Sequence, residues 1–359
     1  MHKIFFCIAL LLMAGNMTAQ IEKADVFMES FALKNNFNGT ILIAKEGKVE
    51  YAKSFGLANF QFKIPNTIDT KYKIASITKA FTAVLILQLY EKGNLDLNKT
   101  IKTYLPDYTG EGTDKVTITH LLNMTSGIQN MDEGMTLESV LQKGMPQYQK
   151  PFTSDEMLVQ FCSGKLVTTP GKVFDYNNAD YILLGRIVEK ITGKTFEENL
   201  IKEILQPLKM MNSGMIYQKN IVEGLADTYF YRDDIKAMVN DLPVYMENWH
   251  ASGAMYSTAE DILKFSDALF SRRLLSQKIL DLMFASGLDE YGYGVWVYKD
   301  YDINHKKYTI VKRPGSIMGA QAMLFHILEN NTTIIILSNT GTVSLDDLTA
   351  RLAKKIVAN

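Results

Sequence analysis

The sequence contains few cysteines and no excess of charge of either sign. Only two of its 359 residues are cysteine, which excludes a disulfide framework. Its 38 basic and 39 acidic side chains leave no basic surface of the kind that neutralises nucleic-acid phosphates, so no nucleic-acid partner is expected. The 23 glycines and 8 prolines are too few for a collagen-like or disordered chain. With 47% hydrophobic residues, the composition predicts a globular protein with a substantial core.

The N-terminus carries an unbroken apolar run, Ile4–Ala14, after a short charged start. This run of 11 residues is too short for a membrane-spanning helix, which needs about twenty. The pattern predicts a secretory signal peptide over residues 1–19 with cleavage after Ala19, and hence an exported protein, periplasmic or secreted. Cys7 lies inside the run rather than after it, so no stable membrane anchor is expected once the signal is removed. The other cysteine, Cys162, is predicted to be a small buried side chain.

Hydrophobic periodicity along the remaining chain predicts an α+β fold. Residues 20–75 and 286–359 are expected to form one α/β part, and residues 76–285 a mostly helical part inserted between them. Expected helices lie at Ile21–Asn35, from Ser76 to a stop at Gly93, and at Ile118–Met124, Asn178–Ile191, Thr258–Leu269 and Asp346–Val357; expected strands are a hairpin around Glu46-Gly47 and the segments Gly292–Tyr298, Tyr308–Lys312, Gln321–Ile327 and Thr332–Leu337.

Several common catalytic motifs are missing from the sequence. The five histidines form no zinc-binding helix pair, and no G-x-S-x-G elbow occurs. Glycine-rich phosphate loops are also absent, so neither a metal nor an organic cofactor is predicted. With these motifs absent, the remaining candidate is a catalytic site with a hydroxyl nucleophile that is not activated by histidine.

The segment Ser76-Ile77-Thr78-Lys79 fits such a nucleophile. A serine in the first turn of a helix lies near free backbone N–H groups and the positive end of the helix dipole. A lysine three residues later lies on the same face, where it can accept the serine proton or stabilise the alkoxide. Taken alone, the motif would fit equally well a helix-capping Ser76 with a solvated Lys79.

Two further segments carry groups that such a nucleophile needs. Tyr176 and Asn178 follow a Pro-Gly turn directly before a predicted helix; the phenol could relay protons and the amide could hold a substrate carbonyl. The segment Arg313-Pro314-Gly315-Ser316 follows a predicted strand, where the glycine would let a substrate approach the strand edge. A backbone N–H near Ser316, paired with that of Ser76, would make an oxyanion hole.

Together these motifs resemble the serine β-lactamase and penicillin-binding superfamily, specifically its branch of class C β-lactamases, DD-peptidases and esterases. The resemblance covers about residues 22–355 and includes the flanking stretches Asn38–Asn59, Ile74–Ser76, Leu121–Gly127, Tyr181–Gly193, Ala251–Asp261 and Leu337–Asn339. It implies a β-lactamase/transpeptidase-like fold, with an antiparallel sheet flanked by the N- and C-terminal helices and an inserted, mostly helical domain. It also implies Ser76 as the acylated nucleophile, Lys79 and Tyr176 as the general-base system, and Asn178 as a substrate-binding residue.

The third motif departs from this pattern, because Arg313 stands where relatives usually have lysine or histidine, with Pro314 beside it. A guanidinium stays protonated and can bind a carboxylate through two parallel hydrogen bonds. We therefore expect Arg313, with Gly315 and Ser316, to contribute to binding a small-molecule or peptide substrate with a free carboxylate. Met124 also replaces a frequent histidine, which we interpret as a change in packing.

The sequence favours a serine hydrolase with DD-peptidase-like, D-amino-acid peptidase or esterase activity. A class C-like β-lactamase ranks last, because the third motif lacks its Lys-Thr-Gly form. The alternative from another class is a penicillin-binding-like receptor or regulator that has lost turnover.

Overall fold

A computed structural model describes residues 20–357, so the predicted signal peptide at residues 1–19 lies outside the described residues. At its centre is an antiparallel six-stranded sheet with the order β10-β11-β12-β13-β1-β2. The strands of the sheet are β1 (Gly39–Lys45), β2 (Lys48–Phe55), β10 (Trp296–Ile303), β11 (Lys306–Ile317), β12 (Ala320–Ile327) and β13 (Thr332–Ser338). Strands β1 and β2 come from the N-terminal part of the chain and β10 to β13 from its C-terminal part, so the main sheet joins the two.

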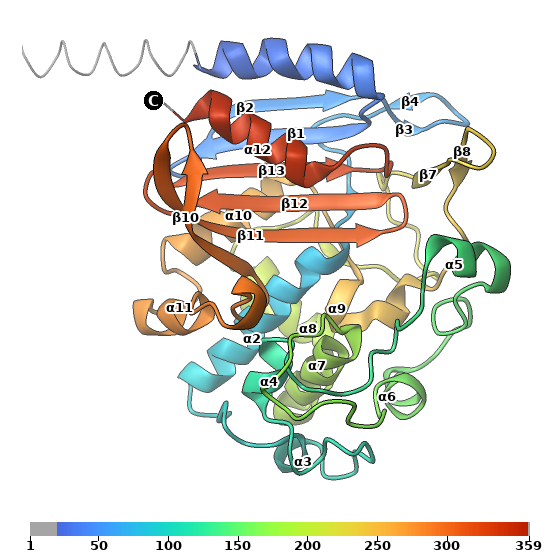
Figure 1. Cartoon of the computed structure of the whole chain (residues 1–359), viewed down its shortest axis with the longest axis vertical. Helices are drawn as coiled ribbons and strands as arrows, with labels where there is room; N and C mark the ends of the chain where they lie inside the picture. The colour runs from blue at the N-terminus through green and yellow to red at the C-terminus, as the bar shows by residue number, and fades with distance from the viewer. Residues whose placement is uncertain (1–19, 358–359) are drawn as a thin grey trace, which may run out of the picture.

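Both faces of the sheet are covered, because its strands carry apolar residues at successive positions. On β13, Ile334 and Ile336 face one core while Ile335 and Leu337 face the other. The first core is closed by the helix at residues 20–35 and by α12 (Leu345–Ile356), which crosses the sheet in Figure 1. The second core is larger and continues into the helical part of the molecule. This alternation follows from the two-residue period of a strand.

The helical part is built around α2 (Thr78–Glu91) and α7 (Asn178–Thr192), which pack against each other beside the sheet (Figure 1). Helix α2 is buried on nearly all sides, as expected for a segment that is apolar all round. The other helices are α3 (Ile101–Tyr104), α4 (Ile118–Leu122), α5 (Leu137–Lys143), α6 (Ser154–Phe161), α8 (Phe196–Leu200), α9 (His250–Gly253), α10 (Ala259–Phe270) and α11 (Gln277–Met283), with short helical turns η1 (Ala75–Ile77), η2 (Ile201–Leu205), η3 (Met246–Trp249) and η4 (Leu288–Glu290).

Short strands that the periodicity did not predict also occur outside the main sheet. They are β3 (Leu57–Asn59), β4 (Ile64–Pro65), β5 (Tyr72–Lys73), β6 (Gly214–Met215), β7 (Tyr229–Arg232), β8 (Ala237–Asn240) and β9 (Met255–Ser257). Runs of two to four residues are too short to show a two-residue alternation. The α+β fold class is confirmed, whereas the division of the chain into two parts stays a prediction. Helix α10, which lies in the predicted helical part, packs on the main sheet.

Two details of the C-terminal strands differ from the prediction. Strand β10 begins at Trp296 rather than at Gly292, and β11 runs through Arg313 and Pro314 to Ile317 rather than ending at Lys312. Cys162 is buried, as predicted. Within residues 20–357, no helix is both long enough and apolar enough to cross a membrane.

Candidate active site

Ser76 lies in η1, the single helical turn that leads into α2. The preceding residue, Ala75, is held at φ +47°, a left-handed conformation that costs energy for a residue with a Cβ. The Thr78 hydroxyl donates to the Ala75 carbonyl at 2.7 Å, which helps to stabilise this turn. The strained turn leaves Ser76 partly exposed although its neighbours Ala75 and Ile77 are fully buried.

Lys79 lies one turn further along and is completely buried. Its amine donates to the Ser76 hydroxyl at 3.1 Å, to Asn178 Oδ1 at 2.7 Å and to the Ser252 carbonyl at 2.8 Å. The contact that the spacing of Ser76 and Lys79 predicts is therefore present, and Lys79 is not a solvated charge.

Tyr176 reaches the same place from the loop before α7. Its carbonyl accepts a hydrogen bond from the Asn130 side chain at 2.9 Å, and the neighbouring Asp175 N–H donates to the Met124 carbonyl at 2.9 Å. Met124 is fully buried, in agreement with a packing role. The ring of Tyr176 lies with its centroid 4.8 Å from the Lys79 amine.

Arg313 is also fully buried at this site. Its Nε donates to the Ser76 carbonyl at 2.6 Å and its Nη1 to the Tyr291 hydroxyl at 3.0 Å, while Nη2 donates to the Tyr176 hydroxyl. The Arg313 Cζ lies 5.4, 5.9 and 5.2 Å from the ring centroids of Tyr176, Tyr291 and Trp296. These rings and hydrogen bonds offset the cost of burying the guanidinium.

This position does not support the carboxylate-binding role expected for Arg313. The guanidinium is enclosed by protein rather than open to a substrate, and three of its five N–H groups are already bonded to Ser76, Tyr291 and Tyr176. The carboxylate-binding role stays a prediction, and the burial of Arg313 among aromatic residues from distant parts of the chain argues against it.

The pKa values of both Lys79 and Tyr176 are lowered at this site. Burial is the main cause that lowers the pKa of Lys79, to about 8, and the Arg313 cation contributes to this lowering. Tyr176 and Asp132 act in the opposite direction. For Tyr176, burial raises the pKa, but the Arg313 and Lys79 cations outweigh it and bring the pKa down to about 8. Both groups therefore lose a proton more readily than a free lysine or tyrosine does.

Gly315 allows β11 to lie directly against η1. A Cβ at this position would be 2.4 Å from the Ile74 carbonyl oxygen and 3.0 Å from the Ser76 nitrogen. Strand β10 pairs with β11 only as far as Lys312, so residues 313–317 have a strand neighbour, β12, on one side only. Ser316 is exposed at this free edge.

Asn178, the first residue of α7, connects Lys79 with a residue that the sequence did not single out, Asp132. While Asn178 Oδ1 accepts from Lys79, its Nδ2 donates to Asp132 Oδ2 at 2.6 Å. Asp132 Oδ1 in turn accepts from the Tyr148 hydroxyl at 2.8 Å. A cavity of about 450 Å³ adjoins these groups and is lined by Asp132, Tyr148, Asn178, Trp249 and Ser316 among others.

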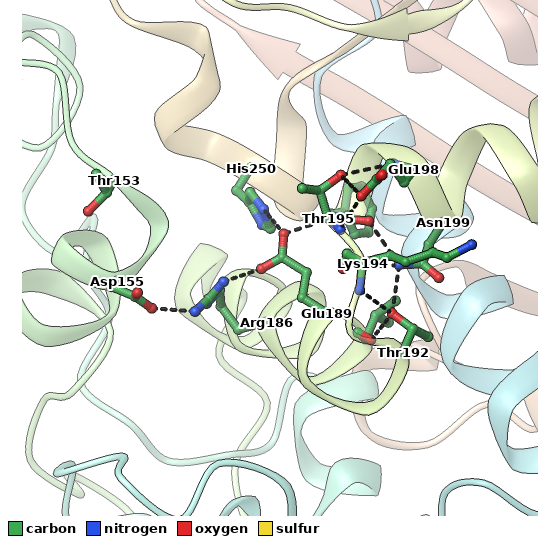
Figure 2. A network of polar contacts seen from close by, with 12 residues as sticks. Thr153, Asp155, Arg186, Glu189, Thr192, Lys194, Thr195, Glu198, Asn199 and His250 are labelled. Carbon is green, nitrogen blue, oxygen red and sulfur yellow. Dashed lines mark hydrogen bonds and ion pairs between the residues drawn. The ribbon is translucent and has the colours of Figure 1, made fainter.

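Figure 2 shows a polar network that joins α7 to the start of α9, the short helix that also contains Ser252. Glu189 of α7 accepts from the Phe196 N–H at 2.8 Å and lies 3.3 Å from Nε2 of His250, the first residue of α9. Burial raises the pKa of Glu189, but His250 and its other partners outweigh this and lower it to about 2. Gly185 of α7 allows α9 to approach, since a Cβ there would lie 2.5 Å from that of Ala251.

The comparisons with known proteins agree with this geometry. A profile of the Beta-lactamase family matches residues 30–358, and the chain belongs to this family. Within it, the protein is a serine hydrolase of the β-lactamase and penicillin-binding superfamily.

Three relatives illustrate the similarity. Penicillin-binding protein 4* of Bacillus subtilis (strain 168) is 28% identical over 332 residues, which are 88% of this chain and 71% of the relative. The teichoic acid D-alanine hydrolase of Staphylococcus aureus (strain MRSA252) is 24% identical over 307 residues, 84% of this chain and 70% of the relative. The crystal structure of a penicillin-binding protein from Bacillus halodurans superimposes with a TM-score of 0.77 at 28% identity, covering 90% of this chain and 98% of the other.

The site contains three contributors that sequence patterns did not reveal: Asp132, Tyr291 and the Ser252 carbonyl. The glycine and aromatic residues of Tyr291–Trp296 indicated close packing, whereas Asp132 lies in no recognisable motif. Ser252 lies in the family-like stretch Ala251–Asp261, but it contributes through its backbone carbonyl, which a sequence pattern does not reveal. Within residues 20–357, no group of three or more His, Cys, Asp or Glu side chains is arranged to hold a metal ion.

Proposed function

We propose that the protein is an exported hydrolase that forms an acyl-enzyme on Ser76 and acts on esters or amides of D-amino acids. The observation that carries this proposal is the hydrogen bond from the buried Lys79 amine to the Ser76 hydroxyl, beside the phenol of Tyr176. A hydroxyl is a weak nucleophile unless a neighbouring base takes its proton. Lys79 and Tyr176, both with a pKa near 8, supply such a base close to neutral pH.

The proton then moves through the pair in two stages. During attack on the carbonyl, the Ser76 proton passes to whichever of Lys79 and Tyr176 is unprotonated, and the Ser76 oxygen bonds to the carbonyl carbon. When the tetrahedral intermediate collapses, Tyr176 donates a proton to the leaving group, and water later releases the acyl group. Arg313 stabilises the phenolate form of Tyr176 through its hydrogen bond and its positive charge.

Two backbone N–H groups, those of Ser76 and Ser316, form the oxyanion hole in this proposal. The close approach of Gly315 to the Ser76 nitrogen, which leaves no room for a Cβ, supports it. Asn178 binds the acyl half of the substrate, because its amide borders both Lys79 and the cavity.

The substrate class rests on the relatives and on the site. One relative is named as a teichoic acid D-alanine hydrolase and others as penicillin-binding proteins, so D-alanyl esters and peptides ending in D-alanine are the first compounds to test. Export is supported by the apolar N-terminal run, which ends before the family match begins at residue 30.

Hydrolysis of an activated ester and of a peptide ending in D-Ala-D-Ala tests this proposal. We expect the protein to turn over at least one of them and Ser76→Ala to abolish that activity, whereas the control Ser271→Ala, at an exposed serine after α10, retains it. Turnover that persists in Ser76→Ala would contradict the assignment. A protein that binds such compounds without turnover would instead be the receptor or regulator considered above.

A further inference from the structure

Asp132 places a carboxylate at the edge of the catalytic site. It belongs to the loop between α4 and α5 and lines the 450 Å³ cavity. Its Oδ2 accepts from Asn178 at 2.6 Å and its Oδ1 from the Tyr148 hydroxyl at 2.8 Å, with Gln147 Nε2 at 3.3 Å from the same oxygen. Asp132 is thus one amide away from Lys79, which donates to the other end of Asn178.

No positively charged side chain hydrogen-bonds to Asp132, and the Lys79 amine acts on it only from the far side of Asn178. The side-chain hydrogen-bond partners of Asp132, namely Tyr148, Asn178 and Gln147, are all neutral. Burial, and then Asp132 itself, raise the pKa of Tyr148 well above its usual value, so the phenol stays a donor to the carboxylate. A carboxylate has about four lone-pair positions, and these contacts leave room for a further donor.

The remainder of the cavity contains no second charge. Among the described residues that line it, Asp132 is the only charged one. Tyr148 and Trp249 stack at a centroid distance of 3.6 Å with 4° between their planes, and Met135, Met145 and Met318 add apolar surface. A single carboxylate among aromatic and apolar walls favours a ligand with one positive charge, since the low dielectric strengthens the pairing.

We propose that Asp132 binds a primary ammonium group on the acyl half of the substrate, so that the enzyme prefers aminoacyl esters or amides with a free amine. This inference rests on the proposed function, because it assumes that the acyl group is transferred to Ser76. Asp132 would contact the acyl half rather than the leaving group, because Tyr176 donates its proton to the leaving group and so holds it on the Tyr176 side of the site. The acyl group is then left beside Asn178 and Asp132.

Two esters of the same shape separate recognition of the charge from general activity. In the p-nitrophenyl esters of D-alanine and of isobutyric acid, an ammonium group in one takes the place of a methyl group in the other. We expect Asp132→Asn to lower kcat/KM for the D-alanine ester about 10- to 100-fold, the range for losing a hydrogen bond to a charged group. The isobutyrate ester should change less than about threefold. Asp132→Glu, which keeps the charge, should restore part of the preference.

The matched control is Glu133→Gln, which removes a carboxylate from the next, exposed residue of the same loop and should leave both esters unaffected. An equal loss for both esters in Asp132→Asn would overturn the proposal, because it would show that Asp132 only positions Asn178. Acylation of Ser76 by a penicillin, whose acyl amine is blocked, separates the two proposals. If penicillin acylates Ser76 while the wild type does not prefer the D-alanine ester, only the ammonium site is wrong. If neither the esters nor penicillin acylate Ser76, the proposed function fails as well.

Discussion

Replacing Arg313 with methionine should move the pH dependence of Ser76 acylation upward. In the wild type, loss of one proton from the Lys79 and Tyr176 pair creates the base, so acylation should rise with pH through about 8. The Arg313 cation lowers the pKa of both groups, and a neutral side chain of similar length would remove that effect. Acylation at pH 7 would then become slower, while the rate at high pH would be reduced less.

The size of this shift follows from the distance between the groups. Arg313 Cζ lies 5.4 Å from the centroid of the Tyr176 ring. Unit charges at that separation, in an effective dielectric of about 20, interact by about 3 kcal/mol. Since one pH unit corresponds to about 1.4 kcal/mol, the midpoint should rise by about two pH units.

The assay is the rate of acylation by a chromogenic penicillin or cephalosporin, followed by stopped flow between pH 6 and pH 10. Arg313→Lys is the control, because it keeps the positive charge and should shift the midpoint much less. Thermal unfolding of each variant shows whether the fold is retained. A midpoint that stays at about pH 8 in Arg313→Met would refute the reasoning.

Three further predictions follow from the same contacts. Gly315→Ala should lower the acylation rate at least tenfold by pushing β11 away from η1, since its Cβ would lie 2.4 Å from the Ile74 carbonyl oxygen; an unchanged rate would contradict the close approach. Arg313→Met should lower kcat/KM by similar factors for acidic and neutral esters, and a much larger loss for the acidic ones would restore the carboxylate-binding role. Burial lowers the pKa of His326 from 6.5 to about 3, so the unfolded chain takes up the proton first and stability should fall as pH drops below 6.5. Between pH 6.5 and pH 5, urea unfolding should show the wild type losing about 2 kcal/mol more than His326→Gln, and equal losses would show that His326 is not the cause.

The elements that position the site were predictable where a local pattern dictates them. The apolar surface of α2, the helix after Asn177 and the hairpin of β1 and β2 each follow from a periodicity or a turn within a few residues. The Ser76 and Lys79 pair was predictable for the same reason, since residues three apart share a helix face.

The sequence was least informative about features that depend on contacts between distant segments. The strand expected to end at Lys312 continues to Ile317 as β11, and Pro314, which lacks an N–H, is tolerated there because β10 does not pair with β11 beyond Lys312. The role of Arg313 depends on Tyr176, Tyr291 and Trp296, which surround it only in the folded chain. Neither feature is visible in the residues next to position 313.

Asp132 shows the same limit more clearly. A single aspartate in a polar loop has no distinguishing pattern, and its importance comes from the cavity and from its contact with Asn178. A sequence can therefore indicate the nucleophile of such an enzyme more readily than the groups that select its substrate.

The central claim, that Ser76 is the acylated nucleophile, is tested most directly by the mass of the purified protein after incubation with a penicillin. Trypsin would release Ile74–Lys79, which contains Ser76 and Thr78 as its hydroxyls, so fragmentation of this peptide locates the adduct. We predict one penicilloyl group on Ser76 and none in Ser76→Ala. An adduct on another residue, or an equal adduct in Ser76→Ala, would contradict the account.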